Sequence, residues 1–307
     1  MNKTPFPIPE VLKPKYWLVW FGLLIMWCLC QLPFSIASRI SGGMGSLLYY
    51  LLLSRRRISM INLEACFPDK SPDELTTIAK ANFRHLGYLL VEAGFSWWRS
   101  EKTINKLVHL SGTEHLDLAL KAGNGVIMLT GHMTSLELGG QALGMRYPTH
   151  LMYKRSRNIL TEVIIRRGRQ RFAENIFLHS GIRNILTALK KNEAVWYAPD
   201  QDFGPQRSVF ADFFDIPTAT IPTTGNLVKK TGAAVVPFYP IRLPNHQGLE
   251  IRVLPALQGL GGGEDVKDAR IINASIEAAV AKNPEQYMWL HRRFKTRPPG
   301  MPELYKR

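Results

Sequence analysis

The sequence predicts an α/β protein with a mixed central sheet covered by helices, preceded by an N-terminal membrane helix. From residue 71 onward, short apolar runs typical of buried strands alternate with helical stretches. Residues 16–38 contain no Asp, Glu, Lys or Arg, which is typical of a segment in contact with lipid. The formal net charge of +15 favours a polyanionic partner, and the apolar start favours an anionic bilayer over nucleic acid.

The first predicted element is the membrane helix. Its core reads WLVWFGLLIMWCLC, and a run of about 20 apolar residues spans a hydrocarbon layer of roughly 30 Å. The run is too long for the apolar part of a signal peptide and lacks a clear cleavage site, and Pro33 is expected to end or kink it. We therefore divide the chain into a membrane anchor, residues 1–40, and an α/β domain, residues 41–307, with a basic membrane-facing surface.

The next elements are two helices. Residues 44–53 are apolar, too short to span, and followed by three arginines, so they form either a helix on the membrane surface or an ordinary buried helix. Ser71 and Glu74 flank Pro72 in the pattern of a capping box, which predicts a helix from Ser71 to about Trp97. Trp97 has two open roles, in lipid contact and in the core.

The body then alternates strands and helices, which predicts a largely buried sheet with helices packed against it. The expected strands are 126–129, 151–153, 195–198, 234–239 and 249–254. The expected helices are 135–145, 159–172, 182–190 and 269–281, with a flexible glycine-rich loop at 259–263.

The stretch VIMLTGHMTSLELGG, residues 126–140, carries the first candidate site. His132 follows a buried strand, and Glu137 comes five positions later. If Ser135 caps the following helix, Glu137 can turn back to the imidazole, fix its tautomer and make the other ring nitrogen a general base. A buried, structurally satisfied histidine is the competing interpretation, because this short pattern is common.

Four stretches in order, GHMTSLELGG, LMYKRSRNILTEVIIRRGRQRF, EAVWYAPDQDFGPQRSVFADFF and PEQYMWLHRRFKTRPPGMPELY, resemble the late acyltransferases of lipid A biosynthesis. These lauroyl and myristoyl transferases of the Gram-negative inner membrane belong to the lysophospholipid acyltransferase-like superfamily, so the resemblance implies a glycerolipid-acyltransferase-like fold. It also implies acyl transfer from acyl carrier protein to a secondary hydroxyl of a lipid A precursor. His132 would be the base, Glu137 its partner, and the catalytic body would face the cytoplasm.

Further site residues come partly from this resemblance. Asn158 and Arg169 match the family pattern, and Arg171 lies in the same GRxR stretch. A guanidinium at Arg169 could hold a phosphate or a developing oxyanion by paired hydrogen bonds. Glu162 and Arg166, on the same helical face, are interpreted as a solvated ion pair.

Two positions nearer the C-terminus complete the set. Asp200 follows a predicted strand, and it either positions the acceptor or caps a loop. With Asp202 alone it is too small a ligand set to predict a metal. Arg292 lies among aromatic and basic residues near the C-terminus, a composition that suits the phosphates of a glycolipid or an acidic carrier protein.

These expectations define a function and its alternatives. The partners expected are acyl carrier protein, a lipid A precursor and anionic phospholipid, with no nucleic acid. No cofactor or metal is expected, because a thioester donor is already activated. The alternatives are an acyltransferase acting on another glycolipid or a lysophospholipid, a membrane-bound hydrolase, and a non-catalytic basic scaffold. The hydrolase is disfavoured because the sequence has neither Gly-x-Ser-x-Gly nor His-Glu-x-x-His.

Overall fold

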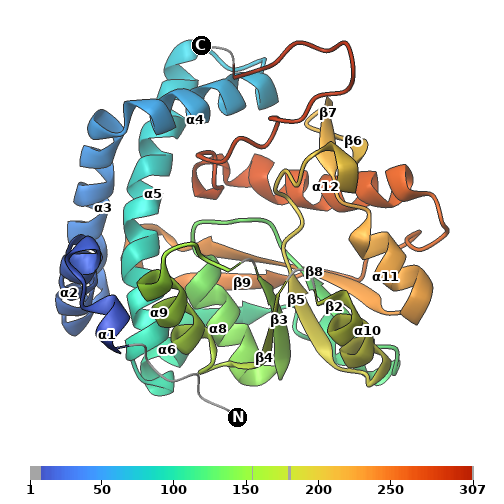
Figure 1. The fold of residues 1–307 in the computed structure, drawn as a ribbon, viewed down its shortest axis with the longest axis horizontal. Helices are drawn as coiled ribbons and strands as arrows, with labels where there is room; N and C mark the ends of the chain where they lie inside the picture. Colours follow the sequence, from blue (N-terminus) through green and yellow to red (C-terminus); the bar gives the residue numbers. More distant parts are fainter. Residues whose placement is uncertain (1–7, 154, 179–180, 306–307) are drawn as a thin grey trace.

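A computed structural model describes the chain over residues 8–153, 155–178 and 181–305. The predicted α/β class is confirmed, with a seven-stranded sheet between layers of helices (Figure 1). Across the sheet the strands are β1 (Val108–Ser111), β9 (Leu249–Val253), β8 (Ala234–Arg242), β2 (Val126–Leu129), β5 (Ala194–Tyr197), β3 (Thr149–Tyr153) and β4 (Ala173–Leu178). All neighbours are parallel except β8 and β9, so the sheet is mixed as expected.

Both faces of the sheet are buried. Ile127 and Leu129 of β2 enter one core cluster and Val126 and Met128 enter the other, because successive strand residues point to opposite faces. The first face is covered by α10 (Ile182–Lys190), α11 (Thr223–Thr231) and α12 (Asp265–Lys282). The second is covered by α7 (Glu114–Lys121) and α8 (Leu136–Arg146).

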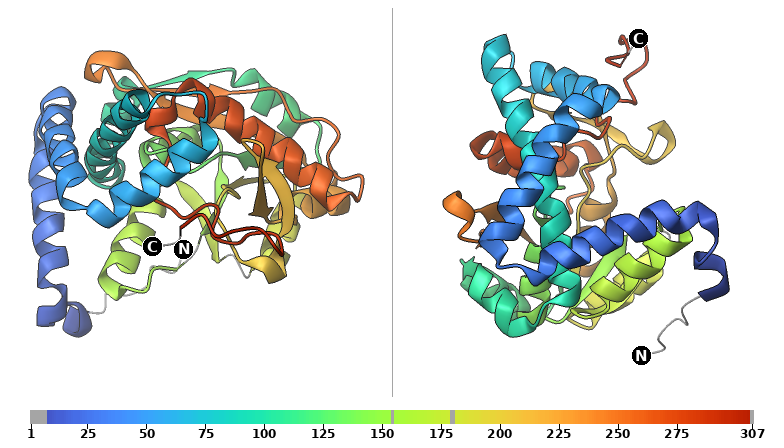
Figure 2. Two further views of the ribbon diagram at one scale, coloured as in Figure 1. Left: turned by 90° about the horizontal axis from the view of Figure 1, so that it is seen from above. Right: turned by 90° about the vertical axis from the view of Figure 1, so that its left-hand side faces the viewer.

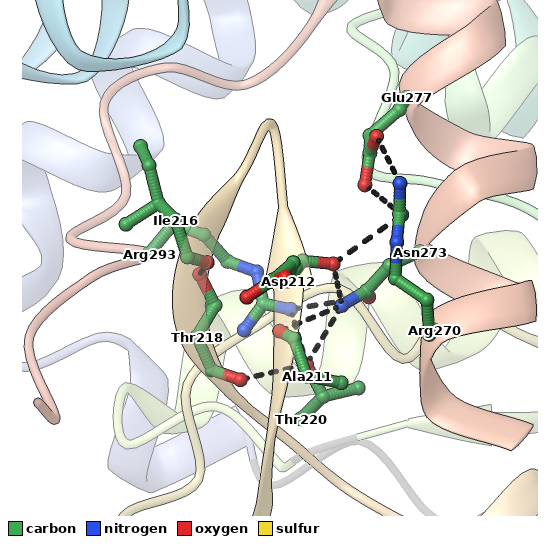
Figure 3. A network of polar contacts seen from close by, with 9 residues as sticks. All are labelled: Ala211, Asp212, Ile216, Thr218, Thr220, Arg270, Asn273, Glu277 and Arg293. Carbon is green, nitrogen blue, oxygen red and sulfur yellow. Dashed lines mark hydrogen bonds and ion pairs between the residues drawn. The ribbon is translucent and has the colours of Figure 1, made fainter. Parts of the chain in front are cut away.

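A small hairpin is attached outside the sheet by a buried polar network. Its strands are β6 (Val209–Phe213) and β7 (Ile216–Thr220), joined through the two positive-φ residues Phe214 and Asp215. Arg293 is 2% exposed and donates to the Ala219 carbonyl at 2.6 Å. Asn273 of α12 donates to the Asp212 carbonyl at 2.9 Å, and Figure 3 shows this contact beside Arg293. These bonds fasten the C-terminal segment, the hairpin and α12 together.

The remaining short elements are α6 (Glu101–Leu107), α9 (Ile159–Arg169), η2 (Pro205–Arg207), η3 (Pro244–His246) and η4 (Pro284–Gln286).

The predicted membrane helix is replaced by two helices. Its run is divided at Leu32 and Pro33, where α2 ends at Gln31 and α3 begins at Phe34, as expected of the proline. Among the residues that the structure describes, no helix has both the length and the apolarity needed to cross a bilayer. The spanning helix is therefore not confirmed.

The N-terminal elements are α1 (Ile8–Val11), η1 (Pro14–Tyr16), α2 (Trp17–Gln31), α3 (Phe34–Leu51), α4 (Leu53–Cys66) and α5 (Pro72–Trp98).

The helix α3 packs along α5, and the two lie side by side at one end of the molecule (Figures 1 and 2). Their backbones meet at glycines: a Cβ added to Gly87 would lie 1.9 Å from the Ser41 carbonyl oxygen, and one added to Gly45 would lie 2.3 Å from that of Phe83. The expected domain boundary at residue 40 falls inside α3. Within residues 44–53, Tyr49 is buried while Met44 and Leu47 are 38% and 58% exposed, so the segment is not buried on all sides. Its contact with a membrane surface stays a prediction.

The helix α5 begins as the sequence predicts. The Ser71 hydroxyl accepts from the Glu74 amide at 3.3 Å, and the Glu74 carboxylate accepts from the Ser71 amide at 2.8 Å. This reciprocal pair satisfies two of the amide groups that a helix start leaves without partners. The long helix that follows brings its last turns beside α8 and α9, which carry two of the candidate site residues.

Candidate active site

His132 lies in the turn that connects β2 to α8, just beyond the carboxyl end of the strand. The turn is held by the segment 286–288: the Thr134 amide donates to the Gln286 carbonyl at 2.8 Å, and the Met288 amide donates to the His132 carbonyl at 3.0 Å. These two bonds anchor the backbone on both sides of the imidazole. The His132 side chain is held in place rather than carried on a free loop.

The carboxylate that binds the His132 ring belongs to Asp200. Its Oδ1 lies 2.5 Å from His132 Nδ1, and its Oδ2 accepts from the His132 backbone amide at 2.7 Å and from the Tyr287 hydroxyl at 2.8 Å. Asp200 follows β5, which is the parallel neighbour of β2. Residues 68 positions apart therefore meet at the carboxyl ends of these two strands.

Asp200 is 1% exposed, and burial alone would raise the pKa of its carboxyl. The interaction with the His132 imidazole, the hydrogen bonds from its ring and amide, and the Tyr287 hydroxyl outweigh this and hold the pKa of Asp200 well below its usual range. An ionised carboxylate can only accept, so Nδ1 of His132 carries the proton. Nε2 is then the nitrogen with the free lone pair.

Glu137 has a different partner from the one the sequence analysis predicts. Its two carboxylate oxygens accept from Arg169 Nε at 3.0 and 3.2 Å, and Oε1 also binds an Nη of Arg169. The predicted pairing of Glu137 with His132 is therefore wrong. The physical reason is that α8 begins at Leu136, so Glu137 lies in the first helical turn, opposite the last residue of α9. Ser135 does not cap this helix with its hydroxyl, which donates instead to the Pro240 carbonyl at 3.0 Å.

The Arg169 guanidinium is fixed on two sides. Burial alone would lower the pKa of Arg169, but the Glu137 carboxylate raises it above its usual value. The ring of Tyr153 lies 5.8 Å from the guanidinium carbon. Behind α9, Trp97 packs against Gly168, where an added Cβ would come within 2.1 Å of the indole. Trp97 is half-buried in this position, and its predicted roles in lipid contact and in the core stay predictions.

His132 and Arg169 both line one cavity of about 270 Å³, which we call the His132 cavity. Its other walls are mostly apolar, and among the described residues the lining is His132, Leu136, Leu151, Met152, Tyr153, Arg169, Trp196, Tyr197, Ala198, Gln201 and Phe203. The cavity combines an oriented imidazole, a fixed cation and an apolar wall. This composition suits the reaction of a polar group carried on an apolar chain.

Comparison with known proteins decides the family. Residues 7–296 match the family described as bacterial lipid A biosynthesis acyltransferase. The chain belongs to this acyltransferase family. It is 38% identical to a lipid A biosynthesis palmitoleoyltransferase of Escherichia coli K12 over 96% of this chain and 97% of that protein. It is 36% identical to the lauroyltransferase of the same strain over 99% and 100%, and 30% identical to its myristoyltransferase over 98% and 95%.

Three other predicted site residues of the acyltransferase, Asn158, Arg171 and Arg292, do not line the His132 cavity. Asn158 caps α9, accepting from the Thr161 amide at 3.0 Å. Arg171 donates to the Ser96 and Arg99 carbonyls at 3.1 and 2.8 Å, which fixes the end of α5. Arg292 is exposed and lies over the Tyr305 ring at 5.7 Å. In these positions Asn158 and Arg171 stabilise the elements that carry Arg169.

Glu162 is not the solvated residue that the sequence analysis expects. It is 5% exposed and accepts from the Tyr153 hydroxyl and, at 2.8 Å, from the Ser156 amide. Its carboxylate thereby fixes Tyr153, which lies against Arg169. The error arose because helical spacing shows which residues share a face but not whether that face meets solvent.

Tyr287 contributes to the acyltransferase site through its bond to Asp200 and was not expected there from the sequence. Tyr287 is 3% exposed, and its neighbour Met133 forms an isolated antiparallel bridge with it. No local pattern distinguishes this tyrosine from a core residue. The position of Asp200 directly after a predicted strand did indicate a site residue, because neighbouring parallel strands bring the residues that follow them close together.

Proposed function

We propose that this acyltransferase moves a fatty acyl chain from acyl carrier protein to a secondary hydroxyl of a lipid A precursor in one step. The observation that carries the proposal is the Asp200–His132 pair at the wall of the His132 cavity. The family supplies the reaction class, and the oriented imidazole supplies a base for it. His132 is thus the residue on which the mechanism depends.

The reaction begins with the acceptor hydroxyl. Nε2 of His132 takes its proton, and the oxygen attacks the carbonyl carbon of the thioester. Asp200 stabilises the imidazolium that forms, because its carboxylate already holds Nδ1–H. The tetrahedral intermediate collapses with cleavage of the C–S bond, and the carrier thiolate leaves with the electron pair and receives the proton from the imidazolium.

Arg169 is proposed to stabilise the negative charge on the tetrahedral oxygen. Glu137 engages Nε and one Nη of the guanidinium, which leaves N–H groups for a second acceptor. A fixed cation at the cavity wall needs no reorganisation as charge develops, so its effect is large. In this mechanism Glu137 is a positioning residue for Arg169. No cofactor or metal takes part, because the thioester supplies its own activation.

The acyltransferase is further proposed to lie on the cytoplasmic face of the Gram-negative inner membrane. On α2, Trp17, Leu18 and Phe21 are 64%, 81% and 60% exposed, which fits a helix lying in the interfacial layer. The arginines that open α4 would meet anionic phospholipid. The net charge of +15 suits the acidic acyl carrier protein as donor.

Mass spectrometry with purified components tests the function. The full chain is incubated with acyl–acyl carrier protein and a lipid A precursor, and the product should gain the mass of one acyl chain. His132→Ala should abolish the product, whereas His109→Ala, at an exposed position on β1, should not. Transfer to a lysophospholipid but not to the lipid A precursor would contradict the proposed acceptor. A covalent acyl-enzyme would contradict the single step.

A further inference from the structure

A second, larger cavity of about 590 Å³ shares no described lining residue with the His132 cavity. It is formed by α3, α5, the connection between β8 and β9, and the segment around η4, and we call it the Arg84 cavity. The arginines, histidines and carboxylates that line it are Arg39, Arg84, His85, Glu92, Arg242, His246 and Glu285. None of these residues takes part in the mechanism proposed above.

The floor of the Arg84 cavity is a buried ion pair. Arg242 Nε and Nη2 donate to the two oxygens of Glu92 at 2.5 and 2.8 Å, and the side chains of Arg242 and Glu92 are 7% and 2% exposed. The charge of Glu92 is therefore already balanced within the protein. The floor presents no net negative charge to a ligand.

His85 connects this floor to the cavity as a hydrogen-bond donor. Arg242 Nη1 lies 2.7 Å from His85 Nδ1, and because arginine can only donate, Nδ1 must accept. Burial, with Arg242 and Arg84 as lesser causes, lowers the pKa of His85 to about 3. The neutral ring then carries its proton on Nε2, the nitrogen that Arg242 does not engage.

Two further cations line the cavity without acidic partners. Arg39 of α3 and Arg84 of α5 are exposed, and within the described ranges neither guanidinium forms an ion pair. Burial, followed by Arg39 and Arg84, lowers the pKa of His246, which is consistent with positive charge at the mouth. In the part of the chain that the structure describes, the carboxylates that line the cavity are Glu92 and Glu285, and Glu285 offsets these arginines.

The mouth of the Arg84 cavity adjoins an apolar surface. Ile36 and Ile40, on the same helix as Arg39, are 43% and 44% exposed, and Phe34 and Ser38 of α3 line the cavity itself. A ligand held by Arg39 would therefore have its charged part in the cavity and its apolar part along α3. Phosphate esters of lipids have this division, and paired N–H groups of arginine match phosphate oxygens.

We propose that the Arg84 cavity binds the phosphate group of a lipid, with Arg39 and Arg84 as its ligands and His85 as a neutral donor. The site is separate from the His132 cavity but is joined to its turn, because Arg242 Nη1 also donates to the Thr134 hydroxyl at 2.6 Å. The proposal goes beyond acyl transfer and does not require the catalytic roles assigned to His132 or Arg169.

The test measures lipid binding to the full chain in a neutral detergent. Dioctanoyl phosphatidic acid, dioctanoylglycerol and inorganic phosphate are titrated separately, and the unfolding temperature is followed at each concentration. Phosphatidic acid should raise the unfolding temperature by several degrees, and the other two probes by clearly less. Arg39→Ala with Arg84→Ala should weaken the apparent Kd for phosphatidic acid by about ten-fold or more.

The matched control is Arg183→Ala with Lys190→Ala, which removes the same charge from exposed positions of α10 across the molecule (Figure 1). This control should bind phosphatidic acid as the unchanged chain does. If the alanine pair unfolds without ligand, Arg39→Lys with Arg84→Lys is used in its place. Lysine keeps the positive charge but lacks the forked N–H groups of arginine, so this variant should still bind phosphatidic acid more weakly.

Three outcomes would overturn the proposal. Equal weakening in the α10 control would mean a general charge effect, and an equal shift with dioctanoylglycerol would mean apolar binding alone. An equal shift with inorganic phosphate at the same concentration would mean that the cavity takes free phosphate and not a lipid. None of these readouts uses acyl transfer, so a failure of the His132 mechanism leaves the result intact.

Discussion

Asp200 accepts hydrogen bonds from both the ring and the backbone amide of His132, so one buried carboxylate fixes the tautomer and the position of the imidazole. This double contact distinguishes it from a second histidine–carboxylate contact, His150 with Glu193 at 2.8 Å, in which the carboxylate is 40% exposed. A substitution of Asp200 therefore tests the role of the buried carboxylate, and a substitution of Glu193 is its control.

Asp200→Asn should lower the rate of acyl transfer by about 10³–10⁴-fold. The amide can donate to Nδ1 and so favour the tautomer in which Nε2 is protonated and cannot act as a base. The rate is measured with purified chain, and folding is checked by circular dichroism. Glu193→Gln should leave the rate within about two-fold, and a similar loss in both variants would argue against a specific role for Asp200.

Glu137 and Arg169 should behave as one unit in a double-mutant cycle. Glu137→Ala and Arg169→Ala are each expected to lower transfer by about 10²-fold or more, and the double variant should be little worse than the poorer single variant. The reason is that Glu137 acts through the guanidinium it holds. Additive losses would show that Glu137 acts on another group. A rise in apparent KM with unchanged kcat would instead make Arg169 a binding residue.

His85 should make the acyltransferase less stable as the pH falls. Its pKa is about 3 in the folded chain, lowered by burial and by Arg242 and Arg84, whereas an unfolded histidine titrates near 6.5. The unfolded state therefore binds more protons between these values. The free energy of unfolding rises with pH across this window, by at most about 1.4 kcal/mol per pH unit.

Denaturant titrations at pH 4.5, 5.5 and 6.5 measure this slope. His85→Gln should reduce it, while His109→Gln, on an exposed strand position, should not. Part of the slope should persist in His85→Gln, because burial also lowers the pKa of His291 to about 4. Stability that increased toward acid pH would contradict the assignment.

Gly87→Ala should destabilise the protein by about 1–3 kcal/mol or more, because the new Cβ would lie 1.9 Å from the backbone oxygen of Ser41. The obstacle is backbone, so α3 and α5 would have to separate. Gly43→Ala is the matched control on α3: nothing lies within 4 Å of its Cβ position, and it should gain about 0.5–1 kcal/mol from helix propensity. Denaturant midpoints measure both, and equal effects would refute the close-packing explanation.

The interior of the sheet could be predicted from the sequence, and its edges could not. The strand expected at 126–129 and the helix expected at 182–190 occur with those bounds, and the other four expected strands differ by a few residues at their ends. β1 and β4 were missed because they lie at the two edges of the sheet. An edge strand is only partly buried, so VHLS and AENIFL lack the continuous apolar run that marks a central strand.

Four residues of the candidate site were expected from the sequence, but their contacts were not. His132, Glu137, Arg169 and Asp200 were each identified, yet their pairing was assigned by sequence proximity. Glu137 is five positions from His132, whereas the actual partner is 68 positions away. Sequence distance had no bearing here, because the parallel register of β2 and β5 determines which side chains meet.

The amino-acid sequence by itself determined the class of this protein: the apolar runs specify a buried sheet, and four long motifs specify an acyltransferase. Only the tertiary structure decided which carboxylate orients the imidazole, and that Arg39, Arg84 and Arg242 line one cavity. The physical reason is that periodicity and composition report the burial of single elements. Contacts between side chains depend on the relative placement of elements, which strand pairing and helix packing fix in three dimensions.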